Sequence, residues 1–268
     1  MEKEVYTLIS GASMGLGKEL ARECALRKMN LILVALPGEE IELFGTQLQR
    51  DYKIKVDCFE VNLTIDAQIN HLIKVLNEEY NINILINNAG VGGSNAFNQA
   101  SREYIDNIML LNIRATVLLT HSLLDNLKQH SRAHILNIAS MASFSPMPFK
   151  TVYPASKAFV YSFSRGLYSE LKDSGVFVSV AHPGGMATNP QVSERIRRHN
   201  RLVRSTILSV EETAQICIRQ LLKGDSLIIP GAMNKVSYLC LKILPTWLQL
   251  NFFRKSIVKE ITTQKSFA

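Results

Sequence analysis

Tyr153 and Lys157 stand four positions apart in the segment Tyr153-Pro154-Ala155-Ser156-Lys157. On a helix, that separation places both side chains on the same face. A phenol has an ordinary pKa of about 10, and a nearby ammonium group favours the phenolate. Lys157 could therefore bring the pKa of Tyr153 closer to neutrality, so that the phenol acts as a general acid or base. The same spacing also occurs in surface pairs that have no catalytic role.

Ser140 is a second candidate for chemistry, because it follows the apolar run Ile135–Ala139 and precedes Tyr153 by thirteen positions. If the run is a strand, both side chains can project from the carboxyl edge of a sheet. The hydroxyl of Ser140 could then donate a hydrogen bond to a substrate carbonyl. A serine at a strand end also serves as a turn residue or a helix cap, which is its usual role there.

A glycine-rich segment follows the apolar run Val5–Ser10. It reads Gly11-Ala12-Ser13-Met14-Gly15-Leu16-Gly17 and leads directly into a helical pattern. Its glycines let the backbone turn tightly and approach a pyrophosphate, whose charge meets the amide groups at the start of the helix. A turn without a ligand can have the same composition, but the succession of strand, turn and helix favours a dinucleotide site.

A second polar turn, Asn88-Ala89-Gly90, follows the run Ile84–Asn87. Open α/β sheets hold their ligands at the carboxyl ends of the strands, so this turn would line the same crevice as the glycine-rich segment. By itself, an Asn-Gly-type sequence after a strand is more often only a turn.

The elements that must position these residues alternate regularly along the chain. Apolar runs of strand length are separated by stretches of helical periodicity, as in a mostly parallel sheet with helices on both faces. The expected strands are Val5–Ser10, Leu31–Ala35, Lys55–Val61, Ile84–Asn87, Ile135–Ala139, Val176–Ala181 and Leu227–Ile229. The expected helices include Gly15–Lys28, Asp66–Glu79, Ser101–Lys128, Tyr153–Lys172 and Glu211–Leu222. The sequence therefore predicts one doubly wound, Rossmann-like α/β domain with seven strands over residues 1–268.

The composition fits such a domain. Of the 268 residues, 47% are hydrophobic and 20% are charged, which excludes a disordered or collagen-like chain. The four cysteines form no C-x-x-C pair, and the first residues lack the charge pattern of a signal peptide. We therefore expect a reduced, cytoplasmic protein. A spanning helix is not expected, because the most apolar run, Tyr238–Phe253, is interrupted by Lys242 and Pro245.

Taken in order, these motifs resemble the short-chain dehydrogenase/reductase family. The chain carries that family's glycine turn, Asn-Asn-Ala-Gly, active-site Asn, Ser, Tyr-x-x-x-Lys and Pro-Gly-x-x-x-Thr over about residues 5–230. The resemblance implies hydride transfer with NAD or NADP, in which Tyr153 exchanges a proton with the substrate oxygen and Ser140 orients and polarises that oxygen. It also implies that Lys157 holds the nicotinamide ribose and lowers the pKa of Tyr153, and that Asn112 anchors a water in the proton relay.

The resemblance further implies a set of cofactor-binding residues. They are Gly11, Ser13, Met14, Gly15, Leu16, Gly17, Leu36, Asn62, Leu63, Asn88, Ala89, Gly90, Tyr153, Lys157, Pro183, Gly184, Met186 and Thr188. Thr188 would contact the nicotinamide carboxamide or the phosphates. We expect the side chain of His182 to be packed in the core. A metal site is not expected, because the other histidines form no cluster of ligands.

The positions that usually select between NAD and NADP are neutral. An acid at the end of the second strand binds the ribose 2′-hydroxyl of NAD, whereas a nearby arginine accommodates the 2′-phosphate of NADP. Here Ala35 and Leu36 stand at those positions, and Met14 occupies one that is often basic in NADP users. Glu39 and Glu40 would disfavour a 2′-phosphate if they faced it, but we interpret them as the start of a solvated helix face. The preference therefore stays open.

Two segments depart from the alternation of strands and helices. Residues 189–209 resemble the family's variable substrate-binding insert, and their five arginines between Arg195 and Arg204 could meet an acyl carrier, a coenzyme A phosphate or an anionic lipid surface. A solvated helix face is the favoured interpretation of these arginines. The extension 233–263 is amphipathic and carries no acid before Glu260. It could contact a membrane interface through Trp247 and its lysines, cover the substrate pocket or form a subunit contact.

Two functions of different classes follow. The first is an NAD(P)-dependent oxidoreductase that interconverts a secondary alcohol and a ketone, and the tail favours a hydrophobic or acyl-type substrate. The alternative is a catalytically silent nucleotide-binding scaffold or sensor, against which the complete set Asn112, Ser140, Tyr153 and Lys157 argues. Nucleic-acid binding is not expected, since no aromatic stacking platform lies near the arginines. The resemblance also implies a homodimer or homotetramer formed through the helices at 101–128 and 153–172.

Overall fold

Seven parallel strands form the centre of the molecule. The computed structural model describes residues 4–186 and 208–265, with side chains described up to residue 258. The strands are β1 (Val5–Ser10), β2 (Asn30–Ala35), β3 (Val56–Glu60), β4 (Asn81–Asn87), β5 (Ala133–Ile138), β6 (Val176–Ala181) and β7 (Leu227–Ile228). Every residue of β5 is buried, because helices cover both faces of the sheet.

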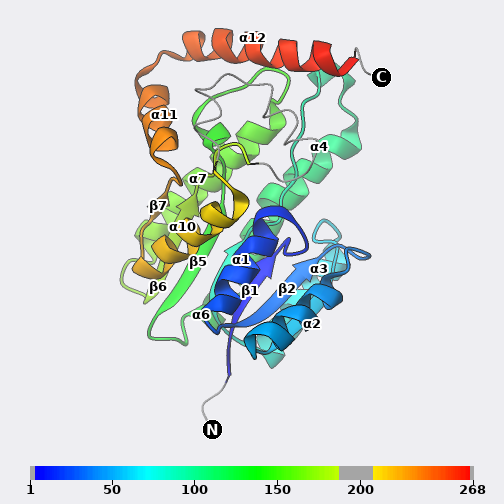
Figure 1. Cartoon of the computed structure of the whole chain (residues 1–268), viewed down its shortest axis with the longest axis vertical. Helices are drawn as coiled ribbons and strands as arrows, with labels where there is room; N and C mark the ends of the chain where they lie inside the picture. Colours follow the sequence, from blue (N-terminus) through cyan, green and yellow to red (C-terminus); the bar gives the residue numbers. More distant parts are fainter. Residues whose placement is uncertain (1–3, 187–207, 266–268) are drawn as a thin grey trace.

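The strand order is β3-β2-β1-β4-β5-β6-β7, and every paired neighbour is parallel. The direction of winding reverses between β1 and β4, so the segments that leave these two strands diverge and open a crevice at their carboxyl ends. The predicted doubly wound fold is confirmed (Figure 1).

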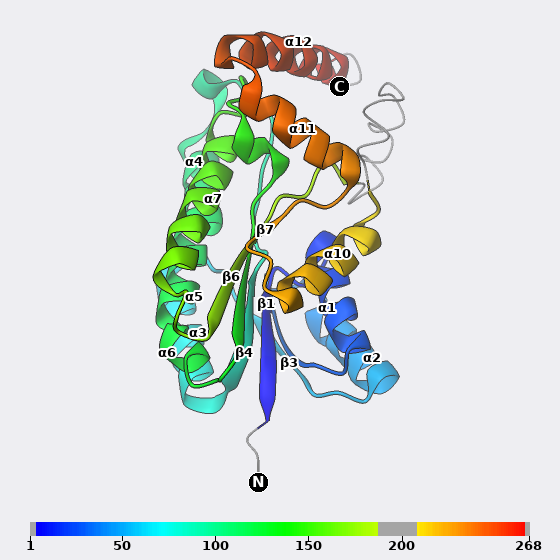
Figure 2. The ribbon, with the colours of Figure 1, turned by 90° about the vertical axis from the view of Figure 1, so that its left-hand side faces the viewer.

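Helices form a layer on each face of the sheet. They are α1 (Gly15–Leu26), α2 (Ile41–Tyr52), α3 (Asp66–Glu79), α4 (Arg102–Met109), α5 (Thr116–Ser122), α6 (Leu124–Leu127), α7 (Val152–Glu170), α10 (Val210–Lys223), α11 (Ala232–Ile243) and α12 (Thr246–Lys265). Three shorter segments are η1 (Phe97–Gln99), the π-helical η2 (Leu110–Ala115) and η3 (Met141–Phe144). Helices α1, α2 and α10 cover one face, and α3 to α7 cover the other (Figure 2).

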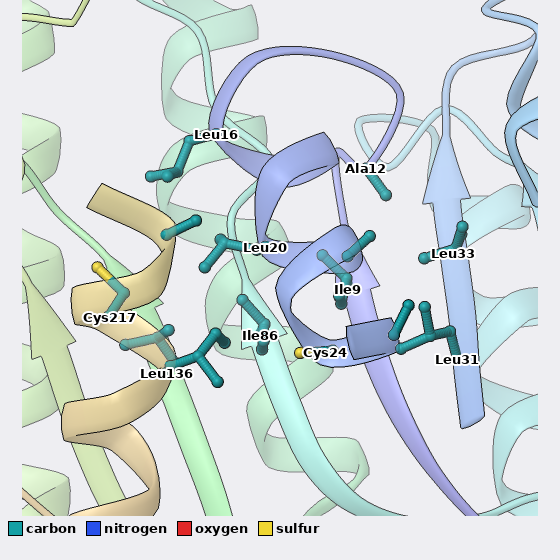
Figure 3. Packing of buried hydrophobic residues seen from close by; sticks show 14 of the residues in the cluster. Ile9, Ala12, Leu16, Leu20, Cys24, Leu31, Leu33, Ile86, Leu136 and Cys217 are labelled. Carbon is teal, nitrogen blue, oxygen red and sulfur yellow. The ribbon is translucent and has the colours of Figure 1, made fainter. Parts of the chain in front are cut away.

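A hydrophobic core lies on each face of the sheet. On the first face, Leu20 and Cys24 of α1 pack with Leu33 of β2 and Cys217 of α10 (Figure 3). A second cluster joins the other face of the sheet to α3 and α5. The sheet therefore holds the carboxyl ends of β1, β4 and β5 in fixed relative positions, which is what a site built from several strand ends requires.

The predicted helical segment Ser101–Lys128 is helical almost throughout, but it is not one regular α-helix. The segment begins as α4, widens into the π-helical η2, continues as α5 and is interrupted at Leu123 before α6. The widening includes Asn112, whose side chain is engaged by a neighbouring loop. Inserted π-turns of this kind are often found at functional sites.

Helix α2 is a further helix, and its sequence carries a helical signal. Ile41, Phe44 and Leu48 are spaced as on one helical face, and all three are buried. Glu40, in the left-handed region at φ 53°, immediately precedes this helix.

Two C-terminal helices, α11 and α12, lie beyond the carboxyl ends of the strands, and α12 lies across that end of the molecule (Figure 1). Within residues 4–186 and 208–265, no helix has the length and apolarity needed to span a bilayer.

Candidate active site

A cleft of about 1570 Å³ opens at the carboxyl ends of the strands. It is lined by most of the predicted cofactor-binding and catalytic residues: Gly11, Ser13, Met14, Gly15, Leu16, Gly17, Leu36, Asn62, Leu63, Asn88, Ala89, Gly90, Ser140, Tyr153, Lys157, Pro183, Gly184 and Met186. Asn112 is buried behind the lining. Thr188 and the arginines between Arg195 and Arg204 lie outside the described residues.

The glycine turn is shaped to bring a helix close to a ligand. Gly11 and Gly15 adopt φ values of +66° and +53°, which favour glycine. A Cβ atom on Gly17 would stand 1.9 Å from the carbonyl oxygen of Gly11, so α1 can approach the turn only because residue 17 lacks a side chain. Among the described residues, the first turn of α1 contains no acid. The glycine turn and the first residues of α1 form a concave surface, which we call the glycine cradle. It fits the pyrophosphate of a dinucleotide, whose negative charge would face the backbone amides of the helix.

The polar turn after β4 is fastened to the glycine turn. The hydroxyl oxygen of Ser10 accepts hydrogen bonds of 3.1 Å from the backbone amides of both Asn88 and Ala89. The Asn88 side chain donates to the carbonyl oxygens of Ser10 and Gly11 over 3.1 and 2.9 Å. The Asn88 turn therefore helps to hold the backbone of the glycine turn.

Asn112 joins the cleft wall to helix α7. Its Oδ1 accepts a 2.8 Å hydrogen bond from the amide of Val91, and its Nδ2 donates 2.9 Å bonds to the Val91 carbonyl and to Ser156 Oγ. Ser156 in turn donates to the backbone carbonyl of Tyr153 over 2.7 Å. Sequence analysis singled out Asn112 but missed Val91 and Ser156, since neither has a local signal for this pairing.

Lys157 is buried, with 5% of its surface exposed. Its Nζ donates a 2.8 Å hydrogen bond to the carbonyl oxygen of Ile138, the last residue of β5. Burial lowers the pKa of Lys157 to about 8. A Cβ atom on Gly90 would stand 3.1 Å from both Lys157 Nζ and Asn112 Oδ1, so the three residues meet at one point of the cleft.

Burial raises the pKa of Tyr153, and a hydrogen bond with Ser140 opposes that rise. Desolvation of the phenolate dominates the shift, and the expectation that Lys157 brings this pKa toward neutrality stays a prediction. A phenol with a raised pKa is protonated at neutral pH and can act as a proton donor. The ring packs so closely on Gly92 that a Cβ there would lie 2.7 Å from Tyr153 Cδ2.

Ser140 has the capping role considered for it, and it also lies in the wall of the cleft. It caps the short segment η3, because its Oγ accepts a 3.1 Å hydrogen bond from the Ala142 amide. It also lines the cleft and interacts with Tyr153.

His182 supports the turn that carries Ser140. As expected it is packed, with no exposed surface and with the Phe144 ring centroid 4.3 Å away. Its Nδ1 lies 3.1 Å from the Ser140 carbonyl oxygen and 2.9 Å from Ser143 Oγ. Burial lowers the pKa of His182 to about 4, so it is neutral near pH 7. Sequence analysis missed this contact with the turn.

Glu39 faces the cleft, so the prediction of a solvated helix face is wrong for this residue. The Ser13 hydroxyl donates a hydrogen bond to the Glu39 carboxylate, and Glu39 lines the cleft beside Leu36. The turn is also held by a 3.2 Å hydrogen bond from the Gly38 amide to Glu60. Glu39 lies in a turn before α2, and the approach of that turn to Ser13 is a tertiary feature that the local pattern does not encode.

The reversal of winding, the glycine cradle and the polar groups at the strand ends define a dinucleotide-binding α/β protein. The sequence model described as short chain dehydrogenase matches residues 6–199. The chain belongs to this family of nucleotide-binding oxidoreductases, and its fold is that of a nicotinamide-cofactor domain.

Two curated relatives and a solved structure are similar to most of the chain. The chain is 27% identical to inactive hydroxysteroid dehydrogenase-like protein 1 of Homo sapiens, over 95% of this chain and 78% of that protein. It is 31% identical to the very-long-chain 3-oxoacyl-CoA reductase of Anas platyrhynchos, over 68% and 60%. A short-chain dehydrogenase from Sphingobium yanoikuyae, solved in complex with NADPH, superposes with a TM-score of 0.78 at 27% identity, covering 89% of this chain and 92% of that one.

Proposed function

We propose that the protein is an active oxidoreductase that interconverts a ketone and a secondary alcohol, with a nicotinamide nucleotide and a bulky apolar substrate. The observation that carries this proposal is the interaction of Tyr153 with Ser140 in a cleft whose other end is the glycine cradle. The bound cofactor would supply or accept the hydride.

The residues of the chain would supply the proton and the positioning. In the reductive direction, Tyr153 donates its phenolic proton to the substrate oxygen, and Ser140 donates a hydrogen bond to the same oxygen. The ammonium group of Lys157 favours the phenolate that forms. Asn112 holds the Val91 backbone and Ser156, which supports the start of α7 and therefore Tyr153.

The position of Glu39 supports a preference for NAD(H) over NADP(H). Its carboxylate lies beside Ser13 and Leu36, at the end of the cleft where the resemblance places the adenosine ribose. In the described part of the chain, three basic residues line the cleft. They are Arg102 in α4, Lys150 in the segment before α7 and Lys157 in α7. Among the described lining residues, none of these three cations lies on the elements that carry Ser13, Leu36 and Glu39, so a 2′-phosphate there would meet a carboxylate, whereas a 2′-hydroxyl could donate to that carboxylate.

The apolar substrate is supported by two observations. Leu110, Leu111 and Met186 line the cleft together with Tyr153. The relative from Anas platyrhynchos is described as acting on a very-long-chain 3-oxoacyl-CoA, which carries a long apolar chain.

A catalytically silent nucleotide-binding protein is the second candidate, because a human relative is described as inactive. The geometry around Tyr153 favours activity. The test is oxidation of NADH and NADPH by the purified protein with a series of ketones of increasing chain length, for the wild type and Tyr153→Phe. The proposal expects turnover by the wild type alone. Binding of nucleotide without turnover of any ketone would favour the silent protein.

The cofactor preference has its own test. Calorimetric titrations compare NADH and NADPH for the wild type, Glu39→Gln and the control Glu40→Gln, which alters the neighbouring carboxylate outside the cleft lining. We expect Glu39→Gln to tighten NADPH binding about tenfold, which corresponds to about 1.4 kcal/mol. Equal effects of both substitutions would contradict the assignment to Glu39.

A further inference from the structure

The outer side of α11 carries exposed apolar residues. Val236, Leu239 and Ile243 are spaced as on one helical face, and they are 50%, 57% and 83% exposed. The opposite side of α11 attaches the helix to the protein. Asn234 is buried and donates a 2.7 Å hydrogen bond to the Pro230 carbonyl, and the Tyr238 ring centroid lies 4.6 Å from that of Phe144. The apolar side therefore points away from the contacts that anchor the helix.

Helix α12 also carries exposed apolar side chains, close to the corner with α11. Trp247 is 62% exposed and Phe252 is 68% exposed. The corner is braced by Gln249, whose Nε2 donates to the carbonyl oxygens of Leu241 and Leu244 over 2.8 and 2.7 Å. We refer to the exposed side chains of Leu239, Ile243, Leu244, Trp247, Leu248 and Phe252 as the C-terminal apolar surface. Both views place α11 and α12 at one end of the molecule (Figures 1 and 2).

The charged side chains in the segment that carries this surface are all positive. No Asp or Glu occurs from residue 226 to residue 259, whereas Lys235, Lys242, Arg254 and Lys255 all lie in the two helices and are exposed. Lys242 also lies over the Tyr238 ring at 4.7 Å. Apolar side chains with a tryptophan and a border of cations are typical of segments that lie in the headgroup region of an anionic bilayer.

We propose that the C-terminal apolar surface docks on the surface of an anionic lipid bilayer. The apolar side chains enter the interfacial region, and the four cations contact lipid phosphates. The binding is peripheral, and it does not depend on the activity proposed above.

Charge complementarity distinguishes the bilayer from a second copy of the chain. A symmetric dimer through this surface would bring its lysines and arginine toward the same residues of the partner, without an acid from residues 226–259 to compensate. An anionic bilayer satisfies both the apolar and the basic parts of the surface.

The surface is also connected to the candidate active site. The inner side of α11 contacts the turn after Ser140 through Tyr238 and Phe144. Asn234 packs against Gly184, where a Cβ would lie 2.7 Å from the asparagine side chain. Docking would therefore place a wall of the candidate active site next to the lipid.

Trp247 provides a direct test, because it is the only tryptophan of the chain. The chain of 268 residues is titrated with vesicles of phosphatidylcholine, with or without about one third phosphatidylglycerol, while tryptophan emission and co-sedimentation are followed. We expect a blue shift, protection from an aqueous quencher and co-sedimentation with the anionic vesicles, all weakened by salt. Unchanged emission and no co-sedimentation with either vesicle would overturn the proposal. A blue shift that depends on protein concentration and occurs without lipid would assign the surface to a second copy and would also overturn it.

Matched variants separate the two parts of the surface. Phe252→Glu should weaken association with anionic vesicles at least about tenfold, because it places a charge where an apolar ring enters the interface. Lys242→Gln and Lys255→Gln should each weaken it about fivefold. Leu43→Glu is the control, since Leu43 is 70% exposed on the distant helix α2. Equal losses from Leu43→Glu and Phe252→Glu would contradict docking through this surface.

Discussion

Lys157 donates a 2.8 Å hydrogen bond from its ammonium group to the backbone carbonyl of Ile138. The bond fastens α7 to the end of β5, two residues before Ser140. One buried lysine therefore fixes the relative positions of the helix that carries Tyr153 and the strand that leads to Ser140. Because the ammonium group of Lys157 is buried, its protonation also makes the stability of the fold depend on pH.

Replacing Lys157 by methionine should stabilise the fold at pH 7. Burial lowers the pKa of Lys157 from 10.5 to about 8, so holding the ammonium in the folded state is unfavourable below pH 8. This lowering of the pKa corresponds to about 3 kcal/mol. Loss of the hydrogen bond to Ile138 offsets about 1 kcal/mol, which leaves about 2 kcal/mol of stabilisation. Urea denaturation measures this difference, and Lys172→Met on the exposed surface serves as the control.

The sign of the pH dependence follows from the lowered pKa. Above pH 10.5 the amine is neutral in both the folded and the unfolded state, so its burial does not lower the stability through protonation. As the pH falls from 10.5 to 8, only the unfolded state gains a proton, and the native state loses stability. The advantage of Lys157→Met should therefore shrink as the pH rises from 8 toward 10. An advantage that grows over that range would contradict the assignment.

The rate of ketone reduction should fall above pH 8. Tyr153, with its raised pKa, stays protonated there, but Lys157 loses the ammonium that favours the developing phenolate. We expect kcat/KM to be level below pH 8 and to fall about tenfold per unit well above it. In Lys157→Arg, the residual kcat/KM should not fall above pH 8, because a guanidinium group stays charged there. A decline at the same pH in that variant would assign it to another group.

Gly17→Ala and Gly166→Ala should act in opposite directions. The added methyl on Gly17 would stand 1.9 Å from the Gly11 carbonyl oxygen, so the glycine turn must move. We therefore expect weaker nucleotide binding and a loss of about 2 kcal/mol or more of folding stability. Gly166 lies inside α7 with nothing within 4 Å of a new Cβ, so alanine should stabilise by about 0.5–1 kcal/mol. Thermal unfolding with and without NADH measures both effects. Equal loss of stability in the two variants would contradict the packing described for α1.

Asn112→Ala should destabilise the protein by about 2 kcal/mol or more, because the amide and carbonyl of Val91 both lose a buried partner. Turnover should fall as well, since Ser156 loses its hydrogen bond from Asn112 and then positions the start of α7 less firmly. The comparison is Asn77→Ala, which removes one exposed hydrogen bond and should cost less than about 1 kcal/mol. Denaturation and steady-state rates are measured together. Stability and turnover like those of Asn77→Ala would contradict the positioning role of Asn112.

The strands and the strand-end motifs could be predicted because their signals are local. Runs such as Ile135–Ala139 are apolar at each position, and glycine spacing after Ser10 reflects the geometry of one turn. The break in the predicted helix at 101–128 could not be predicted, because the π-helical turn accompanies the pairing of Asn112 with Val91, twenty-one positions away. The orientation of Glu39 depends in the same way on a contact with Ser13 from another element.

Transfer of deuterium from NADH labelled at the reactive carbon would show directly whether the protein catalyses hydride transfer to a ketone. The purified wild type and Tyr153→Phe are each incubated with stoichiometric labelled NADH and an apolar ketone, and the alcohol is examined by mass spectrometry. We expect one deuterium on the carbinol carbon with the wild type, and formation of the labelled alcohol about a thousandfold slower with Tyr153→Phe, although that variant still binds NADH. Binding of NADH by the wild type without labelled alcohol from any ketone tested, or equal rates for the two proteins, would contradict it.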